Sequence, residues 1–169
     1  MSLQIDNTQI QVVDEVKLLG TIITSDLKWG KNVDEIIRRG NTRMIILRKL
    51  AEFKAKQSDM RIIYIAYIRS ILEQLCVVWN FSITDENSTD IERVQKNACK
   101  IILGYQYENY ESALTTLNLE DLKSRRIRLC KKFAITCLEN RKTRNMFPKY
   151  RKERLKQSAI PQMQRLLNN

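Results

Sequence analysis

Rows of lysine and arginine at helical spacing are the residues of this chain best suited to bind another molecule. Positions that recur at i, i+3 and i+7 share one face of a helix, where their charges can grip the phosphates of a nucleic acid and release its condensed counterions. A single row of this kind is more often the solvated face of an amphipathic helix. The rows are Lys31, Arg38, Arg39, Arg43, Arg48 and Lys49; Arg93, Lys96 and Lys100; and Arg125, Arg128 and Lys132, with Arg126 and Lys131 beside them.

The net charge of the chain favours a polyanionic partner. Of 169 residues, 30 are Lys or Arg and 19 are Asp or Glu, which gives a formal net charge of +11. Such a balance indicates nucleic acid or an anionic membrane surface. Residues 141–156 contain eight Lys or Arg and one acid but lack the apolar face of a membrane-surface helix, so we expect no membrane partner. Without a motif for base readout, we expect backbone binding without sequence specificity.

Aromatic side chains lie beside some of these cations. Trp29 follows Lys28 between the strand predicted at 16–24 and the helix predicted at 32–53, where it would either stack on a nucleic acid or serve as a packing anchor between strand and helix. Tyr105, Tyr107 and Tyr110 follow Gly104 and would either stack on unpaired bases or cover a small core. In both cases packing is the commoner role.

Residues for catalysis or metal binding are scarce. The chain has no histidine, its four cysteines form no C-x-x-C pair, and no two aspartates are adjacent. The acidic pairs at 14–15, 34–35, 85–86 and 120–121 lie near expected turns or helix starts, where capping explains them. We therefore predict no catalytic residue, no metal and no cofactor, and buried thiols in a reducing compartment. An intracellular location, nuclear or cytoplasmic, follows, since no secretory signal is seen.

The first part of the chain predicts two short β segments and two helices. Alternating apolar residues over 3–13 predict a hairpin that turns at Asp6-Asn7, and residues 16–24 predict one further strand. A stripe that includes Gly40 predicts a helix over 32–53, with another helix packed closely at that glycine. Residues 58–79 are apolar nearly all round, which predicts a central helix buried on every side, with Leu72 in the core and no membrane span.

The second part predicts three more helices. Thr89 and Glu92 match a capping box, and Gly104 would end that helix. A short helix is expected at 110–117, and a last one from a cap at Asn118 to about 142. We expect the inner stripe of this last helix to be Cys130, Phe133, Ala134, Cys137 and Leu138.

These elements predict a mainly α fold: a helical bundle with a small N-terminal β-hairpin or three-stranded piece. We expect a β segment at 1–30, a helical bundle at 31–147 and a basic tail at 148–169.

A train of short phrases in the chain resembles the region after the polymerase palm of jockey-like non-LTR retrotransposon reverse transcriptases. K-x-L-G at 17–20 is followed after six residues by L-K-W at 27–29. I-Y-I-A-Y-I-R-S-I-L-E, V-V-W-N, I-E-R-V-Q-K-N-A-C-K-I-I-L-G, Y-E-S-A-L-T-T-L-N-L-E-D-L and R-R-I-R-L-C-K-K-F-A follow in the same order. The resemblance covers about residues 3–148 and depends on order and spacing.

The resemblance implies a thumb-like region that grips a template–primer duplex, of RNA or DNA, beside the end of the primer. The adjacent metal-binding aspartates of that family are absent, which implies a piece without its palm and without polymerase activity of its own. The residues expected to contact nucleic acid are Lys28, Trp29, Lys31, Arg38, Arg39, Arg43, Arg93, Lys96, Lys100, Arg125, Arg128 and Lys132. The alternatives are a helical module that binds a palm domain or another protein through exposed apolar surface, and an inert degenerate remnant of a transposon.

Overall fold

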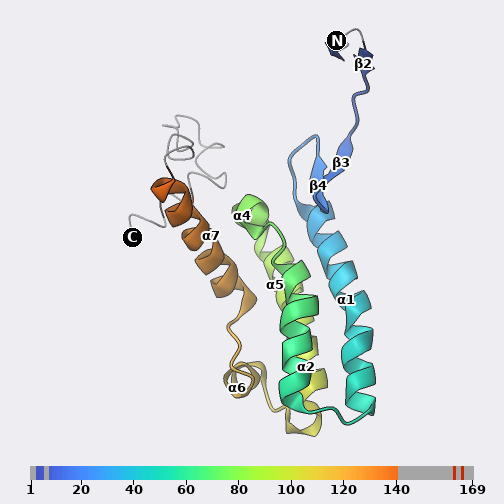
Figure 1. The fold of residues 1–169 in the computed structure, drawn as a ribbon, viewed down its shortest axis with the longest axis vertical. Coiled ribbons are helices and arrows are strands. Elements are labelled where there is room, and N and C mark those ends of the chain that lie inside the picture. Colours follow the sequence, from blue (N-terminus) through green and yellow to red (C-terminus); the bar gives the residue numbers. More distant parts are fainter. Residues whose placement is uncertain (1–2, 6–7, 141–161, 163–164, 166–169) are drawn as a thin grey trace.

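Two antiparallel hairpins precede the helices in the computed structural model, which describes residues 3–5, 8–140, 162 and 165 (Figure 1). The first hairpin pairs β1 (Leu3–Ile5) with β2 (Thr8–Ile10), as predicted. The second pairs β3 (Glu15–Leu18) with β4 (Thr21–Thr24), so the prediction of one strand over 16–24 is wrong. The chain reverses at Leu19 and Gly20, whose φ angles of 50° and 82° suit the tight turn of a two-residue hairpin.

The rest of the described chain is helical, which confirms a mainly α fold. The segments are α1 (Gly30–Glu52), α2 (Gln57–Ile63), the π-helix η1 (Tyr64–Arg69), α3 (Ser70–Leu72), α4 (Cys76–Trp79), the 3-10 helix η2 (Asn80–Ser82), α5 (Asp85–Leu103), the 3-10 helix η3 (Gly104–Gln106), α6 (Tyr110–Thr116) and α7 (Leu122–Glu139). The basic tail predicted beyond residue 147 falls outside the described residues, apart from positions 162 and 165.

The helices form a bundle in which α1 and α7 lie on opposite sides, with α2, α4 and α5 between them (Figure 1). One core of apolar side chains runs through it, from Trp29 and Val33 on the α1 side to Leu122 on α7. Gly40 allows the predicted close packing. A Cβ placed there would lie 3.0 Å from Leu72 Cδ2 and 3.4 Å from Val94 Cγ1.

The segment from α2 to η2 occupies the expected middle position, but it is neither continuous nor buried on every side. Leu75 has a φ of 51° and separates α3 from α4. Leu72 is fully buried, as predicted, whereas Ile62 and Val78 are exposed because α1, α5 and α7 cover only part of the surface of this segment. By length and composition alone, Gln57–Ser82 could also cross a membrane, a test that core helices of soluble proteins pass as well.

Two predicted helix starts are wrong by a few residues. Thr84, not Thr89, caps α5 and accepts a hydrogen bond from the amide of Asn87. Asp121, not Asn118, caps α7, because Asn118 is in a left-handed conformation outside the helix.

The buried stripe of α7 also differs from the predicted one. Cys130 and Ala134 are buried as expected, whereas Phe133 and Leu138 are exposed. The core instead takes Leu122 and Arg126, which continue the i, i+4 series toward the start of the helix. The described part of α7 ends at Glu139 instead of about 142, and Asn140 follows in an extended conformation.

Candidate anion-binding cleft and basic helix faces

The cations predicted on and before α1 are held by contacts within the protein. Arg38 forms an ion pair with Glu35 at 2.8 Å, and Arg39 Nη1 donates to Gln74 Oε1 at 3.1 Å. Arg43 donates to the carbonyl of Tyr67 at 2.7 Å, and its guanidinium lies 4.0 Å from the centre of the Tyr67 ring. Lys31 and Lys28 pair with Glu15 and Asp26 at 2.6 and 3.4 Å. Most cations of this face therefore already have partners: Lys49 also pairs with Glu52 at 2.8 Å, whereas the exposed Arg48 has no polar partner among the described residues.

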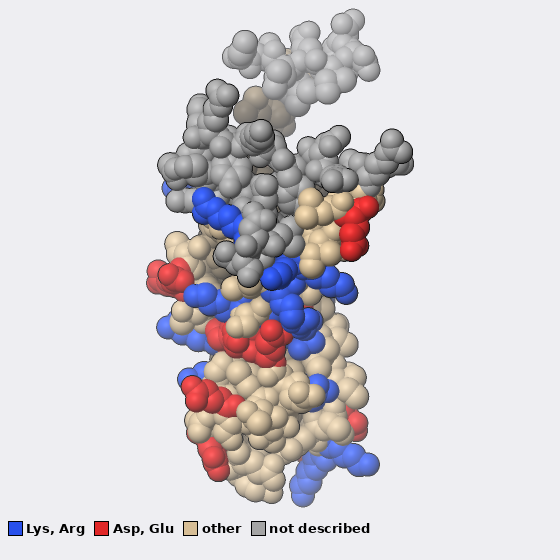
Figure 2. Space-filling model, turned by 90° about the vertical axis from the view of Figure 1, so that its left-hand side faces the viewer, with Lys and Arg blue, Asp and Glu red and all other residues tan. Residues whose placement is uncertain are grey.

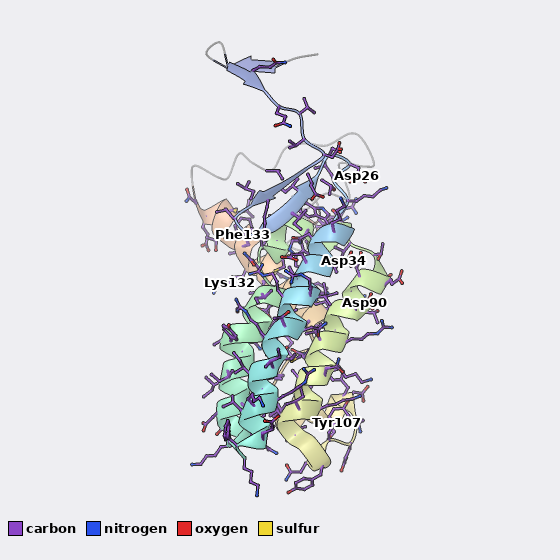
Figure 3. The ribbon with its side chains drawn as sticks, turned by 90° about the vertical axis from the view of Figure 1, so that its right-hand side faces the viewer. Asp26, Asp34, Asp90, Tyr107, Lys132 and Phe133 are labelled. Atoms are coloured by element: carbon purple, nitrogen blue, oxygen red, sulfur yellow. The ribbon has the colours of Figure 1, made fainter. Side chains whose placement is uncertain are left out.

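The predicted row on α5 shows the same behaviour in part. Arg93 pairs with Asp90, and Lys100 lies 5.6 Å from the centre of the Tyr107 ring. Lys96 is exposed and has no hydrogen-bond or ionic partner among the described residues. In Figure 3, Asp90 on α5 and Lys132 on α7 lie on opposite sides of the view.

The side chains of the predicted row on α7 do not form one solvent-exposed face. Arg125 pairs with Glu73 at the end of α3, and Arg128 pairs with Glu120 at 2.8 Å. Lys132 is exposed and makes no polar contact with any residue that the structure describes. Figure 2 looks onto the α7 side and shows Lys and Arg gathered around acidic side chains at mid-height.

Arg126, predicted beside this row, is a core residue. It is 1 % exposed and donates to Asn80 Oδ1 at 2.9 Å and to Ser88 Oγ at 2.7 Å, and it lies 5.9 Å from the Trp79 ring. Burial lowers the pKa of its guanidinium. Arg126 fastens α7 to the α4–α5 region and is not available to a ligand.

A cleft of about 350 Å³ lies between the α2–η1 segment and α7, and four arginines line it. Two of them, Arg61 and Arg69, are separated by more than 50 residues from Arg125 and Arg128. Sequence reasoning predicted the second pair and missed the first, because Arg61 and Arg69 lie singly in an apolar segment. The full lining is Arg61, Ile65, Arg69, Asn118, Leu119, Glu120, Arg125 and Arg128.

Charges at the cleft are unequal. Glu73 lies between two arginines and pairs with Arg69 at 3.4 Å and with Arg125. Arg61 donates to the backbone carbonyls of Leu117 and Asn118 instead of to a carboxylate. With Glu120 paired to Arg128, four guanidinium groups face two carboxylates, which leaves a local excess of two positive charges.

Burial and mutual repulsion both act on Arg69. Its pKa is lowered mainly because the side chain is only 12 % exposed, while Glu73 raises it and the neighbouring Arg125 and Arg61 lower it further. Like charges held this close at partly buried positions are stabilised when an anion binds between them.

A buried polar network reaches the lining of the cleft at Glu120. Tyr64, at the start of η1, donates to Gln95 Oε1 at 2.6 Å, and Gln95 Nε2 donates to the Tyr110 hydroxyl at 2.8 Å and to the carbonyl of Glu120 at 3.0 Å. Tyr110 in turn donates to Glu92, which also accepts from the amide of Leu122 at 3.0 Å. The network joins η1, α5 and the loop before α7, and π-helical turns such as η1 are frequent at functional sites.

The aromatic residues singled out in the sequence mostly pack. Trp29 is 9 % exposed within the core, so it leaves the set of candidate nucleic-acid contacts. Tyr110 is half-buried in the polar network, and burial raises its pKa well above the usual range. Tyr107 packs against the core at the end of the bundle opposite Asp26 (Figure 3). Tyr105 is exposed and remains able to stack.

The excess positive charge of the chain is distributed unevenly. Residues 8–140 contain 21 Lys or Arg and 17 Asp or Glu, whereas residues 141–169 contain nine Lys or Arg and one acid. The high net charge of the chain therefore does not describe the helical bundle. Within the bundle, the cleft is a local concentration of cations.

Cysteines and metal ligands add no second site within the described residues. Cys76, Cys99 and Cys130 are buried thiols, as predicted, and Cys137 is half-buried. Burial raises the pKa of Cys99 to about 12. Over residues 8–140 and the other described positions, no three His, Cys, Asp or Glu side chains lie close enough to hold one metal ion.

Comparison with known proteins identifies no relative, since no protein family, curated protein or solved structure matches the chain.

Proposed function

We propose that this chain binds the sugar–phosphate backbone of nucleic acid without sequence specificity, as a thumb-like, non-catalytic part of an RNA-directed DNA polymerase of the non-LTR retrotransposon type. One observation carries the binding proposal: Arg61 and Arg69 meet Arg125 and Arg128 at one cleft, where two carboxylates leave two positive charges unbalanced. Arginine is well suited to phosphate because its planar fork can donate two parallel hydrogen bonds.

The polymerase context is supported by the sequence resemblance. The order of elements, hairpins followed by a helical bundle, agrees with the strand and thumb that the resemblance implies. The turn of the K-x-L-G phrase has a physical reason in this chain. A Cβ on Gly20 would lie 2.7 Å from Gln74 Nε2, and Gln74 donates to the carbonyl of Leu19 at 2.9 Å.

The binding proposal is tested by fluorescence anisotropy on duplexes of two unrelated sequences, each prepared as DNA and as an RNA–DNA hybrid. We expect dissociation constants of about micromolar at low salt, nearly equal for the two sequences, which weaken steeply as salt rises. Binding that resists salt, or that strongly prefers one sequence, would contradict it. Primer extension with Mg²⁺ or Mn²⁺ tests the catalytic part, and we expect no incorporation of nucleotides.

A second candidate function is protein binding at the hairpin end of the bundle. Large apolar side chains are exposed there: Val16, Leu18 and Leu19 on the hairpin, Leu75 and Val78 near α4, and Phe133 and Leu138 on α7. Exposed apolar surface of this kind favours a docked protein, such as a palm domain. Salt dependence separates the two functions, because apolar docking does not weaken as salt rises.

A further inference from the structure

We propose that the η1–α7 cleft, lined by Arg61, Arg69, Arg125 and Arg128, takes a terminal phosphate monoester at the 5′ end of a nucleic acid strand in preference to internal phosphodiesters. The inference rests on the proposed function, because both place nucleic acid at this cleft. It adds a choice between two kinds of phosphate.

The depth of the cations favours a strand end. The side chains of Arg69 and Arg125 are 12 % and 20 % exposed, so their guanidinium groups are set back from the surface. An internal phosphodiester is flanked by two sugars and presents two unesterified oxygens. A terminal phosphate has one flanking sugar and offers three acceptor oxygens. A terminal phosphate therefore reaches the recessed guanidinium groups with less steric obstruction than an internal phosphodiester does.

The charge of the cleft also favours a monoester. Four arginines face Glu73 and Glu120, which leaves two positive charges. A phosphate monoester carries about −1.5 to −2 charges near pH 7, as phosphorylated side chains do. A phosphodiester carries one negative charge and would balance only half of the excess.

Donor groups remain available after the internal contacts are made. Arg69 and Arg125 approach Glu73 through Nε, and no described residue accepts a hydrogen bond from their terminal Nη groups. Arg61 Nε and Nη2 donate to the carbonyls of Leu117 and Asn118, and its Nη1 has no described acceptor. Three guanidinium groups are therefore fixed in place while several of their N–H groups have no acceptor among the described residues, and this preorganisation lowers the entropic cost of binding.

Size and lining agree with a phosphate and the sugar attached to it. The volume of about 350 Å³ lies at the lower end of the range of about 300–1,000 Å³ that ligand pockets show. Ile65 and Leu119 would supply apolar surface for the sugar, and the four arginines of the lining would supply donors for the phosphate.

The test uses the full chain and two oligonucleotides of the same sequence with a 3′ fluorophore, one carrying a 5′ phosphate and one a 5′ hydroxyl. We expect the phosphorylated strand to bind about tenfold more tightly, equivalent to one strong charged contact. A nucleoside 5′-monophosphate should compete better than inorganic phosphate, and the unphosphorylated nucleoside should not compete. Equal binding of the two strands by the parent protein would overturn the inference.

Variants assign the preference to the cleft. Arg69→Gln with Arg125→Gln keeps donors for Glu73 but removes charge, and should make the two strands bind equally. Arg38→Gln with Arg39→Gln, on α1, is the matched control and should keep the ratio. Arg128→Gln, at a side chain 57 % exposed, should lower the ratio without disturbing the fold, so it serves if the double variant unfolds. A ratio unchanged in Arg128→Gln and in a folded double variant would also overturn the inference.

The affinities of the two strands distinguish a failure of end recognition from a failure of backbone binding. If the 5′-hydroxyl strand binds with steep salt dependence and weakens in the cleft variants while the two strands bind equally, backbone binding stands and end recognition fails. If the parent binds neither strand, both fail.

Discussion

The α1 face and the η1–α7 cleft carry similar numbers of cations but differ in what holds them. On α1, Arg38 pairs with Glu35 one turn away, and Arg43 stacks on Tyr67 and donates to its carbonyl. In the cleft, Arg61 and Arg69 come from one segment and Arg125 and Arg128 from another, and the carboxylates balance half of their charge. We infer that the cleft, where cations from two distant segments gather, is the better candidate for a binding surface than the α1 face.

The largest expected effect tests whether the segment behind the cleft belongs to the core. Leu72 is fully buried and contacts the region around Gly40, so Leu72→Ala should lower the free energy of unfolding by about 2–5 kcal/mol, as large-to-small core changes do. Val78→Ala shortens a side chain that is 43 % exposed and should cost less than about 1 kcal/mol. Urea unfolding of both variants measures the difference, and equal shifts would mean that this segment is not central.

A smaller loss of stability should separate the structural arginine of α7 from its cleft arginines. Arg126→Met leaves Asn80 Oδ1 and Ser88 Oγ without their donors and should cost about 1–3 kcal/mol. Because Arg126 is buried, the folded variant should bind duplex with the affinity of the parent. Thermal melts and anisotropy on one preparation check both statements, and weakened binding by a fully folded variant would place Arg126 in the binding site.

A change in the hairpin turn should affect the α1 side and leave the cleft intact. Gly20→Ala puts a Cβ on a residue whose φ is 82° and places it 2.7 Å from Gln74 Nε2. The Oε1 atom of the same Gln74 side chain accepts a hydrogen bond from Arg39. The strain of a left-handed residue should cost about 1–2 kcal/mol. Urea melts measure this cost, and an equal or greater stability of the variant would show that the turn tolerates a side chain. Duplex affinity should not change.

The smallest expected effect concerns Asp26, beside the start of α1. Hydrogen bonds from the Thr24 hydroxyl and from the backbone amide of Lys28 lower its pKa to about 2. A lowered carboxyl pKa stabilises the folded state above the ordinary value of 3.8, and this stabilisation is lost as pH falls toward about 2. A titration of the Asp26 carboxyl by NMR should give the low midpoint, and Thr24→Val should raise it. A midpoint near 3.8 in the parent would contradict these contacts.

Local patterns predicted much of the fold. The spacing of apolar residues predicted the start of α1 to within two residues and its end to within one. It also predicted the burial of Leu72 and the close packing of another helix at Gly40. The hairpin at 15–24 was missed because Leu19-Gly20 is a turn inside a run that reads as one strand. The break at Leu75 was missed because nothing in the local sequence marks a left-handed leucine.

The candidate site was less predictable, for a physical reason. Local pairs such as Glu35 with Arg38 and Asp90 with Arg93 lie three residues apart and can be read from helical spacing. The approach of Arg69 to Arg125 depends on how two distant segments pack, and helical spacing holds no information on this. The burial of Arg126 follows from the same packing, which turns this side of α7 toward Asn80 and Ser88.

The salt dependence of duplex binding, measured in parallel for a cleft variant and an α1 variant, tests the central claim most directly. Arg69→Gln with Arg125→Gln should weaken binding at least about tenfold near 0.1 M salt and reduce the slope of log K against log salt by about 1, the value for one lost phosphate contact. Arg38→Gln with Arg39→Gln should leave affinity and slope unchanged. Equal losses in both variants, or parent-like binding by a folded cleft variant, would contradict the assignment of nucleic-acid binding to the cleft.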